Sequence, residues 1–345
     1  MKKILIIQTA FLGDLVLTTP FVREVYRKFQ PCQISILVNR GTETILENNP
    51  YIHKVIPLNK EEIKKSLWKF LRFIKEIGSL RFNMVLSPHF SHRSSLISYF
   101  SGAKVRIGYK ESGFSFLHTH TIHRPISEIH EVDKLFSLIY KPDEYPSQKR
   151  PELYLTEKVF RETENFLKDK FIEKSNYILV SPSSVWETKK MPEQKFVELI
   201  RIILQKTNYQ VLLSGSKKDL DLCAKIQGEV NDPKVINIAG ETNLQTLACV
   251  ISLSKAVVTN DSSPTHFASA FNVPTVVIYG ATVPNFGYTP LSEKYYLAEV
   301  DDLSCRPCGI HGGNKCPQNH FSCMLNQDTN KIFENLVKIV FERKN

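Results

Sequence analysis

Residues 256–280 read AVVTNDSSPTHFASAFNVPTVVIYG, and this stretch decides the fold class. It opens and closes with short apolar runs, at 256–258 and 273–279, that have the β-branched composition of buried parallel strands. The residues at 260–263 are of types that cap helix N-termini, and Pro264 suits the first turn of a helix. The stretch therefore predicts a strand, a polar turn, a helix and a second strand.

Such a turn has two interpretations. A helix that begins at the carboxyl end of a parallel strand directs free N–H groups into a crevice, where phosphate is the usual ligand. An ordinary β–α–β connection, capped only for stability, has the same local pattern about as often. The choice between an anion site and a plain connection therefore depends on the rest of the chain.

The alternation of strands and helices continues along the whole chain. Further strands are expected at residues 3–8, 33–38, 54–57, 82–87, 177–180 and 210–213. A charged segment with three prolines, 142–151, interrupts the pattern and marks a linker. We predict an α/β protein of two Rossmann-like, doubly wound domains, residues 1–150 and 151–345, that face a central cleft. A last helix, at about 328–343, could pack back on the first domain.

The composition narrows the class of protein. Of 345 residues, 42% are hydrophobic and 23% are charged, which is typical of a soluble globular chain. No apolar run reaches the roughly 18 residues that span a bilayer, and no signal-peptide cleavage site follows the apolar start, so we expect a cytoplasmic protein. Lys and Arg number 45 against 35 Asp and Glu, a surplus that suits nucleic acid, anionic lipid or phosphorylated small molecules. Because the basic residues form no recognised nucleic-acid motif, we expect no nucleic-acid partner.

Residues 61–75 predict an amphipathic helix with a basic back. Its apolar stripe consists of Ile63, Leu67, Phe70, Leu71 and Ile74. One interpretation packs the stripe on the sheet and leaves the basic back in solvent. The other brings Trp68 and the neighbouring lysines against an anionic membrane surface.

Three consecutive strand ends in the second half are rich in Ser, Gly and Lys. Small residues let backbone N–H groups approach a phosphate, and Lys189 supplies a mobile positive charge. Neither the Gly-x-x-x-x-Gly-Lys nor the Gly-x-Gly-x-x-Gly pattern is present, so we expect a nucleotide diphosphate ligand rather than NAD or hydrolysed ATP. In the first half, His89, His92 and Arg93 follow a strand, and either meet an acidic acceptor or form a solvated loop.

Two sets of residues imitate metal sites. His118, His120 and His123 alternate along one strand face, but no carboxylate or cysteine accompanies them. Asp219 and Asp221 form an Asp-x-Asp pair, yet at a helix start they point about 200° apart around the axis and could not chelate one ion.

The cysteines form a third candidate. Cys305, Cys308, Cys316 and Cys323 fall within one short segment, and the first two have a Cys-x-x-Cys spacing. They either bind a structural metal or pack as reduced thiols, and reduced thiols are our default expectation.

Several motifs resemble a known family. Phe-Leu-Gly-Asp at 11–14, followed by Thr-Thr-Pro at 18–20, is similar to the N-terminal signature of the lipopolysaccharide heptosyltransferases of glycosyltransferase family nine. Lys-Lys-Met-Pro at 189–192 resembles that family's Lys-x-Trp-Pro, and Asn-Asp-Ser-Ser-Pro-Thr-His at 260–266 resembles its Asn-Asp-Ser-Gly-Pro-x-His. The cysteine-containing tail at 305–324 is similar to that of the heptosyltransferase II branch. The resemblance covers nearly the whole chain, in order.

The resemblance implies a GT-B fold and a metal-independent, cofactor-free inverting transfer. Heptose would pass from ADP-heptose to a Kdo/heptosyl-lipid A acceptor in the inner core of lipopolysaccharide, at the inner face of the inner membrane. Asp14 matches the residue that acts as general base in the family, and Lys189 matches the lysine that binds the diphosphate. Asp219 falls where the family keeps a carboxylate that binds the ribose. The implied donor-binding residues are Ser183, Ser184, Lys189, Asp219, Asp261, Ser262, Ser263 and His266. The expected acceptor-binding residues are His89, His92 and Arg93.

Three departures from the family pattern leave the donor sugar open. Ser263 replaces Gly, Met191 replaces Trp, and Ser-Pro-Ser at 181–183 replaces a Pro-Gly-Ala-like turn. The alternatives are a GT-B-fold sugar-nucleotide epimerase, a transferase of another sugar to a cell-envelope glycan, and a non-catalytic sugar-nucleotide binder. Neither the accepting core sugar nor the oligomeric state follows from the sequence.

Overall fold

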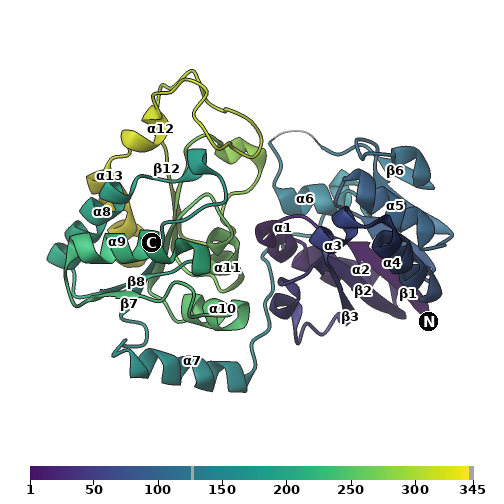
Figure 1. Ribbon diagram of the computed structural model, residues 1–345, viewed down its shortest axis with the longest axis horizontal. Helices are drawn as coiled ribbons and strands as arrows, with labels where there is room; N and C mark the ends of the chain where they lie inside the picture. Colours follow the sequence, from purple (N-terminus) through teal and green to yellow (C-terminus); the bar gives the residue numbers. More distant parts are fainter. Residues whose placement is uncertain (126–127, 342–345) are drawn as a thin grey trace. The chain divides into compact units, whose positions relative to one another are not determined.

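The computed structural model describes residues 1–125 and 128–341, and the chain divides between Tyr154 and Leu155 (Figure 1). The sequence placed this division a few residues earlier, between 150 and 151. Each unit, Met1–Tyr154 and Leu155–Asn345, holds a six-stranded sheet whose neighbouring strands are all parallel.

The first sheet has the strand order β3-β2-β1-β4-β5-β6. Its strands are β1 (Lys2–Ile7), β2 (Cys32–Asn39), β3 (Ile52–Leu58), β4 (Met84–Ser87), β5 (Val105–Tyr109) and β6 (His120–Ile122). The helices are α1 (Leu12–Leu17), α2 (Thr19–Phe29), α3 (Lys60–Lys65), α4 (Leu67–Ser79), α5 (His92–Phe100) and α6 (Glu131–Phe136), with 3-10 turns at Glu43–Leu46, Ser115–Leu117 and Pro142–Glu144. The apolar run at 4–7 is fully buried, as expected of a central strand covered on both faces.

The second sheet repeats this topology, with the order β12-β11-β10-β7-β8-β9. Its strands are β7 (Tyr177–Ser181), β8 (Gln210–Leu213), β9 (Val235–Asn237), β10 (Ala256–Asn260), β11 (Thr275–Ile278) and β12 (Tyr295–Ala298). The helices are α7 (Glu157–Asp169), α8 (Glu193–Lys206), α9 (Leu220–Val230), α10 (Leu244–Ser252), α11 (Pro264–Ala270), α12 (Ser322–Leu325) and α13 (Thr329–Phe341), with 3-10 turns at Glu187–Lys189, Lys217–Asp219 and Pro284–Phe286. The prediction of a parallel, doubly wound α/β fold in each half is confirmed.

In both sheets the strand order reverses at the centre, between β1 and β4 and between β7 and β10. Ligands of open α/β sheets bind beyond the carboxyl ends of the strands at such a switch point. The turns after these four strands are therefore the candidate positions for ligand binding.

The C-terminal helix α13 belongs to the core of the second unit. Ile332 and Leu336 are buried there, and α13 packs against α8, β11 and β12. The contacts that the structure shows for α13 lie within the second unit, where its apolar face completes the layer beside α8. The suggestion that this helix packs on the first domain stays a prediction. Residues 342 and 343 of the expected helix lie outside the described residues.

The predicted helix at 61–75 is two helices, α3 and α4, broken at Ser66. Ser66 has an extended backbone (φ −148°, ψ 118°), and its Oγ accepts a hydrogen bond from the N–H of Lys69, which makes it the N-cap of α4. The buried face of α4 includes Ile74 and Ile77, whereas Leu67 and Leu71 are exposed. The prediction that these two leucines belong to the buried stripe was therefore wrong.

Within residues 1–125 and 128–341, no helix combines the length and the hydropathy needed to cross a bilayer.

Candidate functional site

Asp14 lies in the first turn of α1, immediately beyond β1 at the switch point of the first sheet. Its side chain is half-buried, and its Oδ2 accepts a hydrogen bond from the N–H of Phe11 (3.2 Å). The carboxylate therefore satisfies a free N–H of the helix start, as the capping interpretation requires. A capping role does not exclude chemistry, because one carboxylate has four lone-pair sites.

The surroundings of Asp14 tune its basicity. Burial and then the negative charge of Glu131 raise the pKa of Asp14 to about 6, against the lowering effects of the Phe11 N–H and of Arg124. Glu131 begins α6 and is held by Arg124 through contacts of 2.6 and 2.8 Å. A carboxylate with this pKa is mostly ionised at pH 7 and accepts a proton more readily than an ordinary aspartate.

His89 lies beyond β4, on the other side of the same switch point. Its Nδ1 is 2.8 Å from the Oγ1 of Thr9 and 2.9 Å from the Oγ of Ser94. Burial and the positive charges of Lys60 and Arg93 lower the pKa of His89 to about 4. The ring is therefore neutral near pH 7, so it can form hydrogen bonds with a ligand but offers no positive charge.

Two cations, Lys60 and Arg93, lie near His89. Lys60, at the start of α3, donates from Nζ to the carbonyl of Thr9, and its pKa is lowered by burial and by the positive charges of Arg93 and Lys64. Among the described residues, no Asp or Glu forms an ion pair with Lys60 or Arg93. An anion bound here would relieve their repulsion. Sequence reasoning missed Lys60, although its place just after β3, at the same edge of the sheet, is a signal that could have found it.

The remaining histidines of the first unit have separate surroundings. His92 is exposed and contacts Phe114 edge-on, with ring centroids 4.7 Å apart. His118 is buried beside Gly108, whereas His120 and His123 are exposed and bond to Thr119 and Glu111, respectively. The three histidines of the 118–123 stretch therefore do not converge on a common point.

The second switch point is built around Lys189 and Asp261. The Nζ of Lys189, after β7, lies 2.6 Å from the Oδ2 of Asp261, after β10. The same oxygen accepts a hydrogen bond from the Oγ1 of Thr282 (2.7 Å), a residue beyond β11. Both side chains of the ion pair are nearly buried, with 14% and 10% of their surfaces exposed. The pair fixes the position of the ammonium group while leaving two of its three protons for a ligand.

Asn260 holds the turn that carries Lys189. It is fully buried at the end of β10, donates from Nδ2 to the carbonyl of Pro182 (2.8 Å), and accepts from the N–H of Met191 at Oδ1 (3.1 Å). These two contacts secure both ends of the 182–191 turn. Asn260 was quoted only as part of a motif in the sequence, and the structure gives it this positioning role.

The other expected donor-binding residues lie at the same edge of the sheet. Ser183 and Ser184 follow β7, Asp219 follows β8, and Ser262, Ser263 and His266 follow β10, while β10, β7 and β8 are neighbours in the sheet. The Oδ2 of Asp219 accepts from the N–H and the Oγ of Ser216, both at 2.7 Å. Asp219 therefore caps its own turn through Oδ2.

A loop that precedes α12 braces this site. The buried guanidinium of Arg306 donates to the carbonyls of Gly280 and Thr282 and pairs with Glu299 (2.8 Å). Farther along the loop, the N–H of Gly313 donates to the Oγ1 of Thr188 (2.8 Å), and the N–H of Thr188 donates back to the carbonyl of Gly313. The loop therefore holds both the residue before Lys189 and the residue that bonds to Asp261.

The same loop carries Cys305, Cys308 and Cys316, whereas Cys323 lies in α12. All seven cysteines of the chain are free thiols. Burial and the neighbouring thiols Cys305 and Cys316 raise the pKa of Cys308. Burial raises the pKa of Cys323 to about 11. Within residues 1–125 and 128–341, no three His, Cys, Asp or Glu side chains are arranged to hold a metal ion.

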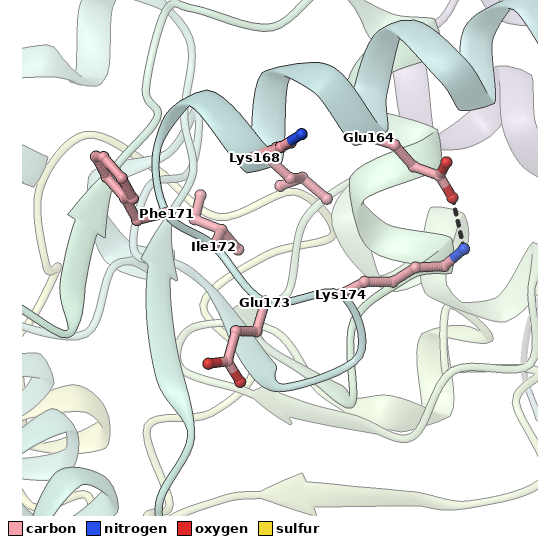
Figure 2. A pocket seen from close by; sticks show the side chains of 7 residues that line it. Glu164, Lys168, Phe171, Ile172, Glu173 and Lys174 are labelled. Carbon is pink, nitrogen blue, oxygen red and sulfur yellow. Dashed lines mark hydrogen bonds and ion pairs between the residues drawn. The ribbon is translucent and has the colours of Figure 1, made fainter.

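A hollow of about 570 Å³ lies at the opposite edge of the second sheet (Figure 2). It is lined by the end of α7 and by residues 171–174, which lead into the amino end of β7. Glu164 and Lys174 pair across it at 2.5 Å. Because ligands of such sheets bind at the carboxyl ends of the strands, this hollow is not the candidate site.

Comparisons with known proteins identify the family. The family model described as glycosyltransferase family 9 (heptosyltransferase) matches residues 70–313. Lipopolysaccharide heptosyltransferase 2 of Escherichia coli (strain K12) is 24% identical over 302 residues, which cover 85% of this chain and 86% of that protein. Lipooligosaccharide heptosyltransferase 2 of Haemophilus ducreyi is 26% identical over 316 residues, 87% and 89% of the two chains.

A solved structure shows the same fold. The E. coli ADP-heptose lipopolysaccharide heptosyltransferase II superposes with a TM-score of 0.80 at 22% identity, over 99% of this chain and 98% of that one. This match confirms the predicted GT-B fold class. Because the family model spans most of the chain, the protein belongs to glycosyltransferase family 9 and is a glycosyltransferase.

Proposed function

We propose that this chain is an inverting heptosyltransferase that moves L-glycero-D-manno-heptose from ADP-heptose to the inner core of lipopolysaccharide. The Lys189–Asp261 pair, positioned at the second switch point in a chain of this family, is the observation that carries the proposal. The named relatives and the solved E. coli enzyme support the donor and the acceptor class.

Asp14 acts as the general base. The acceptor hydroxyl forms a bond to the anomeric carbon while the bond to ADP breaks, and the electron pair of that bond leaves on the diphosphate. The hydroxyl proton passes to the carboxylate of Asp14, whose pKa of about 6 suits this role. Attack from the face opposite ADP inverts the anomeric centre.

The second unit binds the donor. Lys189 offsets the negative charge that grows on the leaving diphosphate, with no metal ion required. Asp261 keeps Lys189 in place through Oδ2, and its Oδ1 accepts hydrogen bonds from sugar hydroxyls. Asp219 meets the ribose. The other donor-binding residues are Ser183, Ser184, Ser262, Ser263 and His266.

The first unit binds the acceptor, a Kdo/heptosyl-lipid A. Arg93 and Lys60 supply positive charge for the anionic groups of the core, supported by their lack of carboxylate partners among the described residues. His89, as a neutral ring, and the exposed His92 contribute hydrogen bonds. We place the reaction in the cytoplasm, at the inner face of the inner membrane.

The purified chain tests this proposal with ADP-heptose and a Kdo/heptosyl-lipid A acceptor. We expect ADP only when both are present, and a product with inverted anomeric configuration by NMR. Isomerised donor without acceptor would favour the epimerase alternative, and a faster reaction with another nucleotide sugar would favour transfer of another sugar. Turnover should survive EDTA; activity lost in EDTA and restored by magnesium would contradict metal independence.

A further inference from the structure

The N-terminal turn of α4 exposes a group of large apolar side chains. Leu67, Trp68 and Leu71 have 72%, 82% and 42% of their surfaces exposed. Leu71 adjoins both Leu67 and Trp68, because residues three and four apart are neighbours on a helix surface. Exposing a tryptophan and a leucine at adjacent positions costs solvation free energy. Contiguous exposed apolar side chains of this kind commonly mark a surface that binds a partner or a membrane.

Folding does not require these side chains. The inner face of α4 already buries Ile74 and Ile77, and Phe70 and Phe73 pack against the same core. The break at Ser66 starts α4 anew and leaves Leu67 and Trp68 outside that face. An alanine at either position would leave the core unchanged.

Basic side chains surround the group. Residues 60–76 contain six basic and three acidic residues. Two of the acids are committed locally, since Glu62 pairs with Lys69 (3.3 Å) and Glu76 pairs with Arg72 (3.2 Å). Throughout the described part of the chain, no carboxylate pairs with Lys64, Lys65 or Lys75.

We propose that this surface, Leu67, Trp68 and Leu71 with Lys64, Lys65 and Lys75, docks on an anionic lipid bilayer. Tryptophan favours the boundary between acyl chains and headgroups, and leucines beside it bury apolar area there. Lysines keep their ammonium groups at headgroup level while their stems lie along apolar surface. The unpaired positive charges select anionic lipids over neutral ones.

The surface is continuous with the candidate acceptor site of the first unit. Lys60 begins α3, and its Nζ bonds to the carbonyl of Thr9, in the turn that leads to Asp14. If the proposed function holds, docking through α3 and α4 brings a lipid-anchored acceptor to that edge of the sheet. The docking itself needs neither donor nor acceptor and can be tested without them.

Vesicle co-sedimentation of the full chain tests the docking. We expect binding to vesicles of phosphatidylglycerol and phosphatidylethanolamine, and little to phosphatidylcholine. The double variant Leu67→Ala, Trp68→Ala should lower the partition coefficient about 10- to 100-fold, the effect of losing two apolar side chains that are partly buried at the bilayer surface. Each change of Lys64, Lys65 or Lys75 to Gln should lower it about fivefold and weaken its salt dependence.

Phe171→Ala is the matched control, because Phe171 is 88% exposed but lies in the second unit. Equal binding of the wild type and the double variant would overturn the proposal. So would an equal loss of binding in the control. Trp68-dependent self-association without vesicle binding would also overturn it and assign the surface to a second copy of the chain.

Activity separates this proposal from the proposed function. The double variant should keep the wild-type rate with a detergent-solubilised acceptor and lose rate only with acceptor embedded in vesicles. Inactivity of the wild type on both acceptor forms would contradict the heptosyltransferase proposal and leave the vesicle-binding result standing. Equal rates of both proteins on vesicles would contradict productive docking.

Discussion

The two sheets have the same strand order, yet their switch points carry opposite electrostatic arrangements. At the second, Lys189 and Asp261 neutralise each other at 2.6 Å, and Thr282 completes the set. At the first, Lys60 and Arg93 repel each other, and among the described residues neither forms an ion pair with a carboxylate. The same fold thus supports a closed network, in which cation and carboxylate are paired, in the second unit. In the first unit it supports an open arrangement, in which the cations await an anionic partner.

The difference indicates how each unit meets its ligand. A preformed ion pair presents an ammonium group in a fixed position, so a diphosphate in the proposed donor site would gain its contact without reorganisation. Unpaired cations repel each other until an anion arrives, so binding of the proposed acceptor at the first switch point would depend on its negative charge. We expect substitutions in the second unit to disturb a fixed ion pair, and substitutions in the first unit to change the attraction of cations for an anionic ligand.

The largest effect should come from Asp14→Asn. The amide keeps the acceptor for the Phe11 N–H but removes the basicity, so kcat should fall about 10²–10⁴-fold while donor affinity stays nearly intact. Steady-state kinetics and ADP titration measure the two quantities.

Thermal unfolding separates this role from a structural one. The pKa of Asp14 is raised from 3.8 to about 6 in the folded state, so folding favours the protonated form. That stabilisation is present below pH 4 and is lost as the pH rises through 6. At pH 7 the neutral Asn variant should therefore unfold at the same temperature as the wild type or higher. A variant with normal kcat and a lower Tm would show that Asp14 serves only as a cap.

Lys189→Ala should break the closed network of the second unit. It removes a charge-assisted contact worth about 1.5–3 kcal/mol, which lowers kcat/KM roughly 10- to 150-fold and weakens ADP binding as well. Lys190→Ala is the matched control, since that lysine pairs with Glu187 at 2.6 Å and not with Asp261. An unchanged kcat/KM for Lys189→Ala would remove the residue from the donor site.

The sequence alone could predict those positions that depend on one strand and its following turn. Asp14, Lys189 and Asp261 each follow a strand with a clear apolar run, so their places at the carboxyl edge could be foreseen. Lys60 was missed although it follows the expected strand at 54–57. The role of Thr282 could not be foreseen, because it depends on which strands are neighbours in the sheet. The break at Ser66 was missed because its capping hydrogen bond competes with a helical periodicity that runs through it.

Arg93→Glu should disturb the open arrangement of the first unit. Reversing the charge adds repulsion toward an anionic acceptor, so the acceptor KM should rise about tenfold and the donor KM should stay the same. Lys104→Glu reverses an exposed charge just before β5, at the opposite edge of the sheet, and should change neither KM. If Arg93→Glu matches the wild type for both substrates, the 88–93 stretch is only a solvated loop.

Thr282→Val tests whether the fixed position of Asp261 matters. Valine keeps the shape but loses the 2.7 Å hydrogen bond to the Oδ2 of Asp261, so the donor KM should rise about three- to tenfold. Thr282→Ser keeps the hydroxyl and should recover most of the loss. Equal defects in the two variants would point to packing rather than to the hydrogen bond.

The smallest effect concerns the charge beside Asp14. Because Glu131 helps to raise the pKa of Asp14, Glu131→Gln should lower that pKa and leave the positive charge of Arg124 to act in the same direction. In the proposed mechanism the rate depends on ionised Asp14, so kcat/KM for the wild type should fall as the pH drops through about 6. This acidic limb of the pH profile should move to lower pH in the variant. At neutral pH the two proteins should differ by less than about threefold, because Asp14 is mostly ionised in both.

Glu111→Gln, which removes a carboxylate paired with His123 instead, should leave the limb in place. An acidic limb that stays near pH 6 in Glu131→Gln would assign it to a group other than Asp14.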